Sequence, residues 1–356
     1  MLSVAGLLVS AVLVQGASVP TDSAPRSRLT ALPVVSYSEV TGMQYGATLF
    51  IGFRVHGDSL TRPSSFSAYA AGTAKGHAKS YLQLDRWSAG SSSRQRIRLE
   101  YLSYPLPFFG LGPDSPHSAE EWYSSVVSTA QAFTQLAWRK SVYLHAGIRY
   151  VRSRMRETEA AGVLQQGLIA GSSGADVLGT ELGIVIDSRD NLSAPRTGTY
   201  ARLLPSVAVK ALGADFTFRR LTLDARRYQT FATNHVAAFQ LQYDAIAGTA
   251  PFDQMPMIGA DTAMRGYPRG RYRDRQAVTA QAEVRSAHWR RIGAVAFAGA
   301  GTVAPAFSKL GTQTWYPSVG AGLRYVLMPR QRTAARVDLA FGRGSFGVSV
   351  GIGEAF

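Results

Sequence analysis

The sequence predicts an all-β protein, a single transmembrane antiparallel β-barrel of about sixteen strands. First, from about residue 33 onward, apolar and polar residues alternate with a period of two in segment after segment, and almost no segment has a helical period. Second, many segments reach the roughly 9–11 residues of a membrane-spanning strand, whereas strands in soluble sheets are mostly about 5–6 residues long. Third, so many long strands must close on one another to remove exposed sheet edges.

The beginning of the chain has the features of a secretory signal peptide. An apolar run over residues 2–14 is followed by small residues at positions 16–18, which suit a cleavage site. The alternative is an N-terminal membrane helix, but the run is shorter than the about 20 residues that a span needs. We therefore expect residues 1–19 to be a signal peptide and residues 20–356 to form one outer-membrane barrel domain.

The strands are separated by turn signals, among them Gly57-Asp58 and Asp190-Asn191. The predicted strands cover residues 33–39, 43–57, 64–75, 79–89, 95–105, 120–139, 142–156, 176–188, 198–211, 214–231, 235–250, 276–289, 292–307, 315–328, 334–343 and 345–356.

The two faces of each strand differ in chemistry. In residues 235–250, for example, Phe239 and Leu241 share one face, whereas Gln240 and Gln242 share the other. This pattern fits a soluble sandwich or barrel with a dry core, or a membrane barrel with lipid outside and water inside. Strand length and an even strand number favour the membrane barrel, and with the signal peptide they predict the bacterial outer membrane as its location.

Composition narrows the classes of function. Charged residues make up 17% of the chain, below the about 25% that is usual for soluble proteins, while the net charge is +15. The basic residues either meet a polyanion or are spread along many strands, and their interleaving with apolar residues argues against nucleic acid. The chain has no cysteine, and no two of its six histidines are three or four residues apart, so we expect no metal site and no cofactor.

The last segment of the chain places its apolar residues on one face. Phe346, Val348, Val350 and Ile352 lie on that face, and the segment ends on it at Phe356. We expect the last strand to run to residue 356 and Phe356 to face outward in an aromatic girdle. Bacterial outer-membrane barrels commonly end in this way, and the barrel-assembly machinery reads that ending. This resemblance makes Phe356 the candidate assembly signal and the machinery a partner for the insertion of the barrel.

Three segments carry a more specific resemblance. Residues 264–267, Met-Arg-Gly-Tyr, are followed by an arginine-rich run and then by a strand. This stretch resembles the Arg-Gly-aromatic motif of the BamA/TamA superfamily of outer-membrane barrels. Residues 187–200 look like the Asp-x-Arg-Asp…Pro-x-x-Gly hairpin of that family, and residues 32–47 are similar to its first hairpin. The resemblance covers about 335 residues, the whole predicted mature chain.

The resemblance implies an inward-folded loop between strands eleven and twelve, with Arg265, Gly266 and Tyr267 as its motif. In the family, acidic side chains on the following strands hold the arginine, and Glu283 is the natural partner here. The family also has an acidic residue on strand thirteen, where this sequence has Gly299. We therefore expect Arg265 to rest on Glu283 alone, and Glu283→Ala to disorder the loop. The alternative is that Arg265 is an exposed loop arginine.

The other basic and acidic residues near these motifs have simpler interpretations. Arg269, Arg271 and Arg273 either line the lumen, which we favour, or meet lipid phosphates at the outer rim, where each cation contributes about 1 kcal/mol. Asp187 and Asp190 are expected to be structural, in a hairpin that faces the periplasm.

The resemblance implies a role in inserting or translocating outer-membrane proteins or lipids. Partners would be outer-membrane lipid including lipopolysaccharide, and unfolded outer-membrane protein clients. Assembly members of the family carry periplasmic POTRA repeats, and we expect none here, because only about 15 residues separate the predicted cleavage site from the first predicted strand. The alternative is a passive or gated pore plugged by the Arg265–Tyr267 loop. An enzyme is not expected, since the sequence has no Gly-x-Ser-x-Gly elbow and no histidine paired with a nucleophile.

Overall fold

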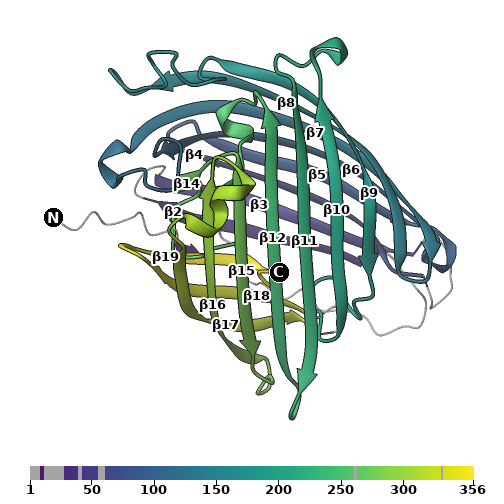
Figure 1. Cartoon of the computed structure of the whole chain (residues 1–356). Helices are drawn as coiled ribbons and strands as arrows, with labels where there is room; N and C mark the ends of the chain where they lie inside the picture. The colour runs from purple at the N-terminus through teal and green to yellow at the C-terminus, as the bar shows by residue number, and fades with distance from the viewer. Residues whose placement is uncertain (1–8, 12–27, 39–41, 55–60, 260–262, 330–331) are drawn as a thin grey trace.

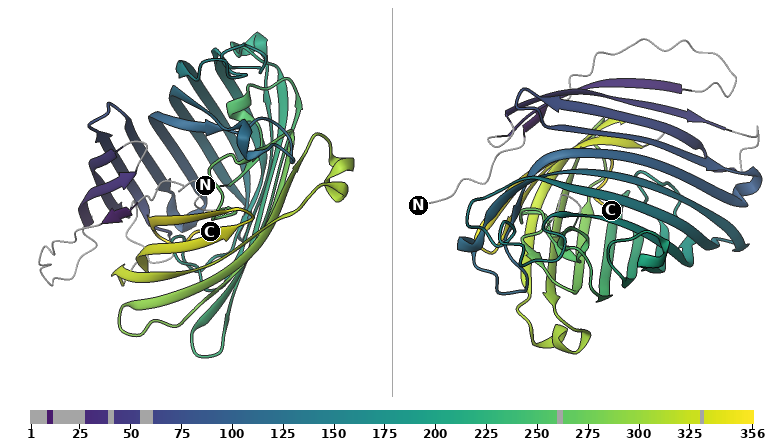
Figure 2. Two further views of the ribbon diagram at one scale, coloured as in Figure 1. Left: turned by 90° about the vertical axis from the view of Figure 1, so that its left-hand side faces the viewer. Right: turned by 90° about the horizontal axis from the view of Figure 1, so that it is seen from above.

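The computed structural model describes residues 9–11, 28–38, 42–54, 61–259, 263–329 and 332–356. Sixteen long strands within these residues form one curved antiparallel sheet, in which chain neighbours pair in sequence (Figures 1 and 2). The strands are β2 (Arg28–Ser38), β3 (Gly42–Phe53), β4 (Ser64–Thr73), β5 (Ala78–Trp87), β6 (Ser93–Phe108), β7 (Glu121–Arg139), β8 (Val142–Thr158), β9 (Gly174–Asp187), β10 (Gly198–Ala208), β11 (Phe218–Phe231), β12 (His235–Gly248), β15 (Gln276–Arg285), β16 (Ile292–Ala304), β17 (Tyr316–Met328), β18 (Thr333–Gly342) and β19 (Ser345–Ile352).

The number and order of the predicted strands are confirmed, but several boundaries differ from the prediction by up to five residues. The boundaries of the first and last strands bear on the function. The first long strand begins at Arg28, five residues before the predicted start, because Arg28 to Leu32 continue the register against β3. The last strand ends at Ile352 and not at Phe356. Gly353, with φ +86°, takes the chain out of the extended conformation there.

The barrel has a polar interior and an apolar exterior. On β12, Leu241 is 44% exposed while its neighbour Gln240 is 4% exposed, and on β15 Val284 is 47% exposed while Glu283 is 1% exposed. A soluble barrel would bury the opposite faces, so the alternative of a dry core is wrong. The part of the chain that the structure describes contains no helix that could cross a membrane.

We expect the response to a new charge to depend on the face that carries it. Leu241→Arg, in the middle of β12 on the outer face, should destabilise the barrel in liposomes by about 2–4 kcal/mol. Gln242→Arg, one residue further on, faces the lumen and should cost much less. Urea unfolding in liposomes, followed by tryptophan fluorescence, would measure both. Equal losses for the two variants would contradict the assignment of the faces.

The longest connection joins β12 to β15, and it is the predicted inward-folded loop between strands eleven and twelve. Its described part contains the 3-10 turn η4 (Phe252–Gln254) and the short pair β13 (Met257–Ile258) and β14 (Tyr272–Arg273). At the same end of the barrel, the connections at residues 109–120, 159–173 and 305–315 are 11 to 15 residues long, whereas no connection between the described strands at the opposite end is longer than 10 residues. Outer-membrane barrels have longer connections on the outside of the cell than on the periplasmic side, so the loop lies at the outer end.

The seam between the first and last long strands is a distinct feature of the described sheet. β2 follows β19 around the sheet, but no residue-by-residue register joins the two in the described part of the chain. A three-residue strand, β1 (Val9–Ala11), pairs with β2 and also lies against β19. β1 belongs to the predicted signal peptide, residues 1–19, most of which lies outside the described residues. Removal of that peptide would take β1 away and leave this edge of β2 free.

Candidate functional site in the barrel lumen

The Arg-Gly-Tyr segment of the loop is held against the inner wall of the barrel. Met264 has a φ of +56° and Gly266 a φ of +98°, so the backbone turns sharply on both sides of Arg265. A Cβ atom on Gly266 would lie 3.0 Å from backbone atoms of Ala340 and Phe341 on β18. Only glycine combines this conformation with so close an approach to a strand.

Arg265 is the centre of the site. Its Nη1 donates to Oδ2 of Asp338 and its Nη2 donates to Oε2 of Glu283, each over 2.8 Å. The guanidinium carbon lies 3.4 Å from the ring centroid of Phe297 on β16. The side chains of all three ionised residues are at most 1% exposed. Such a buried, charge-assisted arrangement fixes the loop to three strands of the wall, β15, β16 and β18.

The expectation that Glu283 acts alone is wrong, because Asp338 supplies a second carboxylate. Asp338 comes from β18, 73 residues after Arg265. Gly299 on β16 offers no carboxylate, and the residue of β16 that meets the guanidinium is Phe297. The sequence carried one signal for Asp338, its place on the polar face of the predicted strand 334–343.

Tyr267 fastens the same segment to the next two strands. Its hydroxyl donates to the carbonyl oxygen of Pro317 and accepts from the backbone N–H of Arg343, over 2.7 Å each. The ring lies against Gly342, where a Cβ atom would come within 2.5 Å of it. The hydroxyl of Ser345 donates to the carbonyl oxygen of Gly266 over 2.7 Å. These bonds tie the loop to β17, to the turn after β18 and to the start of β19.

The arginines after the motif lie inside the barrel. Arg271 is buried, stacks on Tyr272 with its guanidinium carbon 4.3 Å from the ring centroid, and donates to the carbonyl oxygen of Ser115 over 3.0 Å. Arg273 is also buried and donates to the carbonyl oxygen of Phe252, and Arg269 lines a cavity of the lumen. These contacts favour the lumen over the lipid rim for this run.

Burial also changes the ionisation of two carboxyl groups in this connection. It raises the pKa of Asp253 in η4 and that of Asp274 next to β14. A carboxyl group with a raised pKa holds its proton more tightly in the folded loop than in the unfolded chain. Ionising both groups therefore weakens the folded loop as the pH rises from about 3.9, the usual value, through the raised values.

The carboxylates that hold Arg265 are shared with other arginines. Glu283 also accepts from Arg285 over 2.7 Å, and Asp338 also accepts from Arg324 over 2.5 Å and from Arg336 over 3.1 Å. The loop motif is thus one part of a larger buried charge network on the inner faces of β15, β17 and β18.

Comparison with known protein families identifies the family of this barrel. The Omp85 superfamily domain matches residues 78–356. The chain belongs to the Omp85 superfamily. The resemblance to this superfamily is thereby confirmed, and residues 187–200 and 264–267 lie within the match, whereas residues 32–47 lie outside it. The chain is an integral outer-membrane barrel of a family whose members are not enzymes.

Two solved structures share the fold of this Omp85 barrel. The structure of BamA from Haemophilus ducreyi lacking POTRA domains 1–3 is 13% identical, with a TM-score of 0.60, over 92% of this chain and 69% of that chain. CdiB from Acinetobacter baumannii is 12% identical, with a TM-score of 0.58, over 97% of this chain and 65% of that chain. The chain thus spans about two thirds of the length of each. No curated protein sequence matches it.

Phe356 does not lie where the sequence predicted. Instead of facing outward in a girdle, it is 5% exposed and packs inside this Omp85 barrel against Tyr228 and Ala238. Figures 1 and 2 place the C-terminal end within the ring of strands. The apolar alternation predicted an outward Phe356, but the turn at Gly353 reverses the direction in which the following side chains point. Its role as an assembly signal stays a prediction.

The hairpin of residues 187–200 closes the opposite end of the lumen. Asp187 accepts from Arg62 over 2.8 Å and from Arg189 over 2.9 Å. The Oδ1 atom of Asp190 accepts from the backbone N–H groups of Arg196 and Thr197. Although burial acts against ionisation, these N–H groups and the side chain of Arg332 hold the pKa of Asp190 below its usual value. The contacts agree with a structural role.

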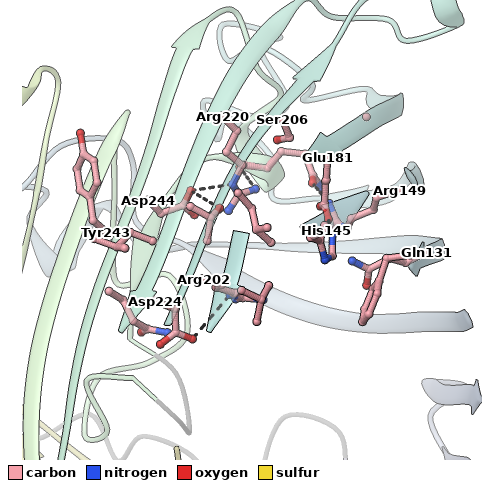
Figure 3. A pocket seen from close by; sticks show the side chains of 18 of the residues that line it. Gln131, His145, Arg149, Glu181, Arg202, Ser206, Arg220, Asp224, Tyr243 and Asp244 are labelled. Carbon is pink, nitrogen blue, oxygen red and sulfur yellow. Dashed lines mark hydrogen bonds and ion pairs between the residues drawn. The ribbon is translucent and has the colours of Figure 1, made fainter. Parts of the chain in front are cut away.

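The lumen of the Omp85 barrel contains two adjoining cavities. One, of about 400 Å³, lies against β6 to β12 and β15 and is lined by His145, Glu181 and Arg220 among others (Figure 3). The other has about 590 Å³, and Arg149, Arg220 and Gln254 line both. Arg149 donates to the side-chain oxygen of Gln254 in η4 over 2.9 Å, so the loop reaches across the lumen between them. The described residues contain no cluster of acidic and histidine side chains that could hold a metal ion.

Proposed function

We propose that this Omp85 barrel takes part in the insertion or translocation of outer-membrane proteins or lipids. The observation that carries the proposal is the seam between β2 and β19. β19 has eight residues, whereas β7 has 19, and β19 forms no pairing register with β2 in the described residues. A free strand edge inside a membrane is costly unless another strand pairs with it. In the described residues β1 pairs with this edge of β2, so the edge can accept a strand of a client once β1 has been removed with the predicted signal peptide.

A second candidate function is a passive or gated pore. It is favoured by the two polar cavities and by the loop that reaches across the lumen between them. In this alternative the Arg265–Tyr267 loop is a plug, and the seam stays closed.

Refolding of a small barrel client tests the insertion proposal. A urea-denatured client is diluted into liposomes with and without this protein, and its folding is followed by its mobility on a gel. We expect the protein to accelerate folding, and Arg265→Ala to lose the acceleration because the loop that braces β15 and β18 is released. No acceleration by a folded, heat-modifiable barrel would contradict the proposal.

A cross-link across the seam separates the two functions. The chain has no cysteine, so Val34→Cys on β2 and Val348→Cys on β19 can be joined by a reducible bifunctional maleimide. Both side chains line the same cavity. Insertion through the seam should stop on cross-linking and return on reduction, while conductance in planar bilayers should persist if the barrel is a pore. Each single-cysteine variant is the control.

A further inference from the structure

The segment that follows β19 enters the lumen and is held there by specific contacts. The N–H of Gly353 donates to the carbonyl oxygen of Ala334 over 2.7 Å, where pairing with β18 ends. Beyond this point the segment no longer follows the wall. Glu354 and Phe356 instead insert their side chains into the charge network described above.

Phe356 occupies an aromatic pocket. Its ring packs against Tyr228 on β11 and Ala238 on β12, which are 1% and 0% exposed. The guanidinium carbon of Arg285 lies 5.9 Å from the ring centroid of Phe356 and 5.7 Å from that of Tyr228. Nη2 of Arg285 also donates to the carbonyl oxygen of Phe356 over 2.8 Å. The pocket therefore recognises both a ring and the backbone that carries it.

Glu354 occupies a cationic subsite two residues earlier. Its Oε2 atom accepts from Nε of Arg324 over 2.8 Å and lies 3.7 Å from Nε of Arg285. Glu354, Arg285 and Arg324 have side chains that are at most 8% exposed. Buried cations of this kind require a carboxylate partner.

The hairpin of residues 187–200 covers the segment from the other side. The N–H of Glu354 donates to the carbonyl oxygen of Ser193 over 3.4 Å, and Nη1 of Arg285 donates to the carbonyl oxygen of Pro195 over 3.2 Å. The segment is thus enclosed by the barrel wall and by this hairpin.

The charges of the network show that, without Glu354, this site would need a carboxylate from another source. Four arginines, Arg265, Arg285, Arg324 and Arg336, face two wall carboxylates, Glu283 and Asp338, and Glu354 is the third carboxylate. Without Glu354 the wall retains twice as many cations as carboxylates.

We propose that this part of the lumen wall is a peptide-binding site, which recognises an acidic residue two positions before a phenylalanine. In this structure residues 353–356 of the same chain occupy it. Each contact is a hydrogen bond, an ion pair or a ring contact that a separate Glu-x-Phe peptide can also make. A peptide in trans would compete with the segment in cis and release the end of β19. The inference stands whether the barrel inserts clients or conducts ions.

The first experiment weakens the internal segment in the full chain. Glu354→Gln combined with Phe356→Ala is refolded in detergent, and its heat-modifiability is checked on a gel. The probe is a fluorescent peptide of residues 351–356, Gly-Ile-Gly-Glu-Ala-Phe, and its anisotropy is measured. We expect saturable binding to the variant, at least about tenfold tighter than to the unaltered barrel, whose site is filled.

Peptide variants test recognition at each subsite. Replacing the glutamate by glutamine, or the phenylalanine by alanine, should weaken binding about tenfold or more, because each removes a contact with a buried arginine. Adding Arg285→Gln to the variant barrel should have a similar effect, whereas adding Arg290→Gln, an exposed arginine in the turn after β15, should not. Absent binding, or equal binding of all peptides, by folded barrels would overturn the proposal. If the double variant does not fold, a chain that ends at Ile352 takes its place, with the same outcomes.

Discussion

Asp338→Asn is expected to destabilise the barrel more than any other single charge removal in the Arg265 network, by about 3–5 kcal/mol. Asp338 accepts hydrogen bonds from Arg265, Arg324 and Arg336, and its side chain is 0% exposed. Its loss leaves three buried guanidinium groups short of a carboxylate. Arg265→Gln should cost less, because Glu283 and Asp338 keep their other arginines.

Urea unfolding would measure the loss of stability, and trypsin cleavage at Arg265, mapped by mass spectrometry, would report release of the loop. We expect cleavage in folded Asp338→Asn barrels and protection in the unaltered barrel. Glu283→Ala should also expose Arg265, but less completely, because the bond to Asp338 remains. A matched control is Asp176→Asn, which also loses bonds from two arginines, Arg152 and Arg154, whose side chains are 54% and 50% exposed.

The control should lose no more than about 1 kcal/mol, since exposed ion pairs contribute little. Similar losses for Asp338→Asn and Asp176→Asn would show that the lumen network is as well solvated as the surface, and would contradict the role given to Asp338.

Gly266→Ala is expected to displace the loop from the wall while leaving every charge in place. The φ of +98° at Gly266 costs a residue with a Cβ atom about 1–2 kcal/mol. The new methyl group would also press against the backbone of β18 at 3.0 Å, where neither side can easily move. The loop should then lose the hydrogen bonds of Tyr267 and its protection from trypsin at Arg265.

Gly213→Ala isolates the effect of that contact. Gly213 has a similar φ, +92°, in the turn before β11, but a Cβ atom there would meet nothing within 4 Å. The Gly213→Ala variant has similar backbone strain but no steric clash, so Arg265 should remain protected from trypsin in it. Exposure of Arg265 in both variants, or in neither, would show that the close packing against β18 is not what holds the loop.

The sequence alone was enough to predict the wall of the barrel. Neighbouring residues such as Leu241 and Gln240 indicate which face of a strand meets lipid, because side chains alternate along a strand with a period of two. The place of the loop between strands eleven and twelve and the pairing of Arg265 with Glu283, 18 residues later, could also be anticipated. For these two features, the family resemblance indicated that the loop folds inward and that an acidic side chain holds its arginine, and the sequence showed which residues these are.

Only the tertiary structure determined which side chains meet inside the lumen. Asp338 reaches Arg265 across 73 residues, and Arg285 reaches Phe356 across 71, because the curvature of the sheet and the depth of the loop bring distant strands together. The alternation of apolar and polar residues indicates neither the curvature of the sheet nor the depth of the loop. The inward turn at Gly353 was not predicted either, although Glu354 interrupts the apolar face of the last segment before Phe356. The alternation in the sequence therefore determined the two faces of each strand, and the packing of the curved sheet and its loop determined which charges meet inside it.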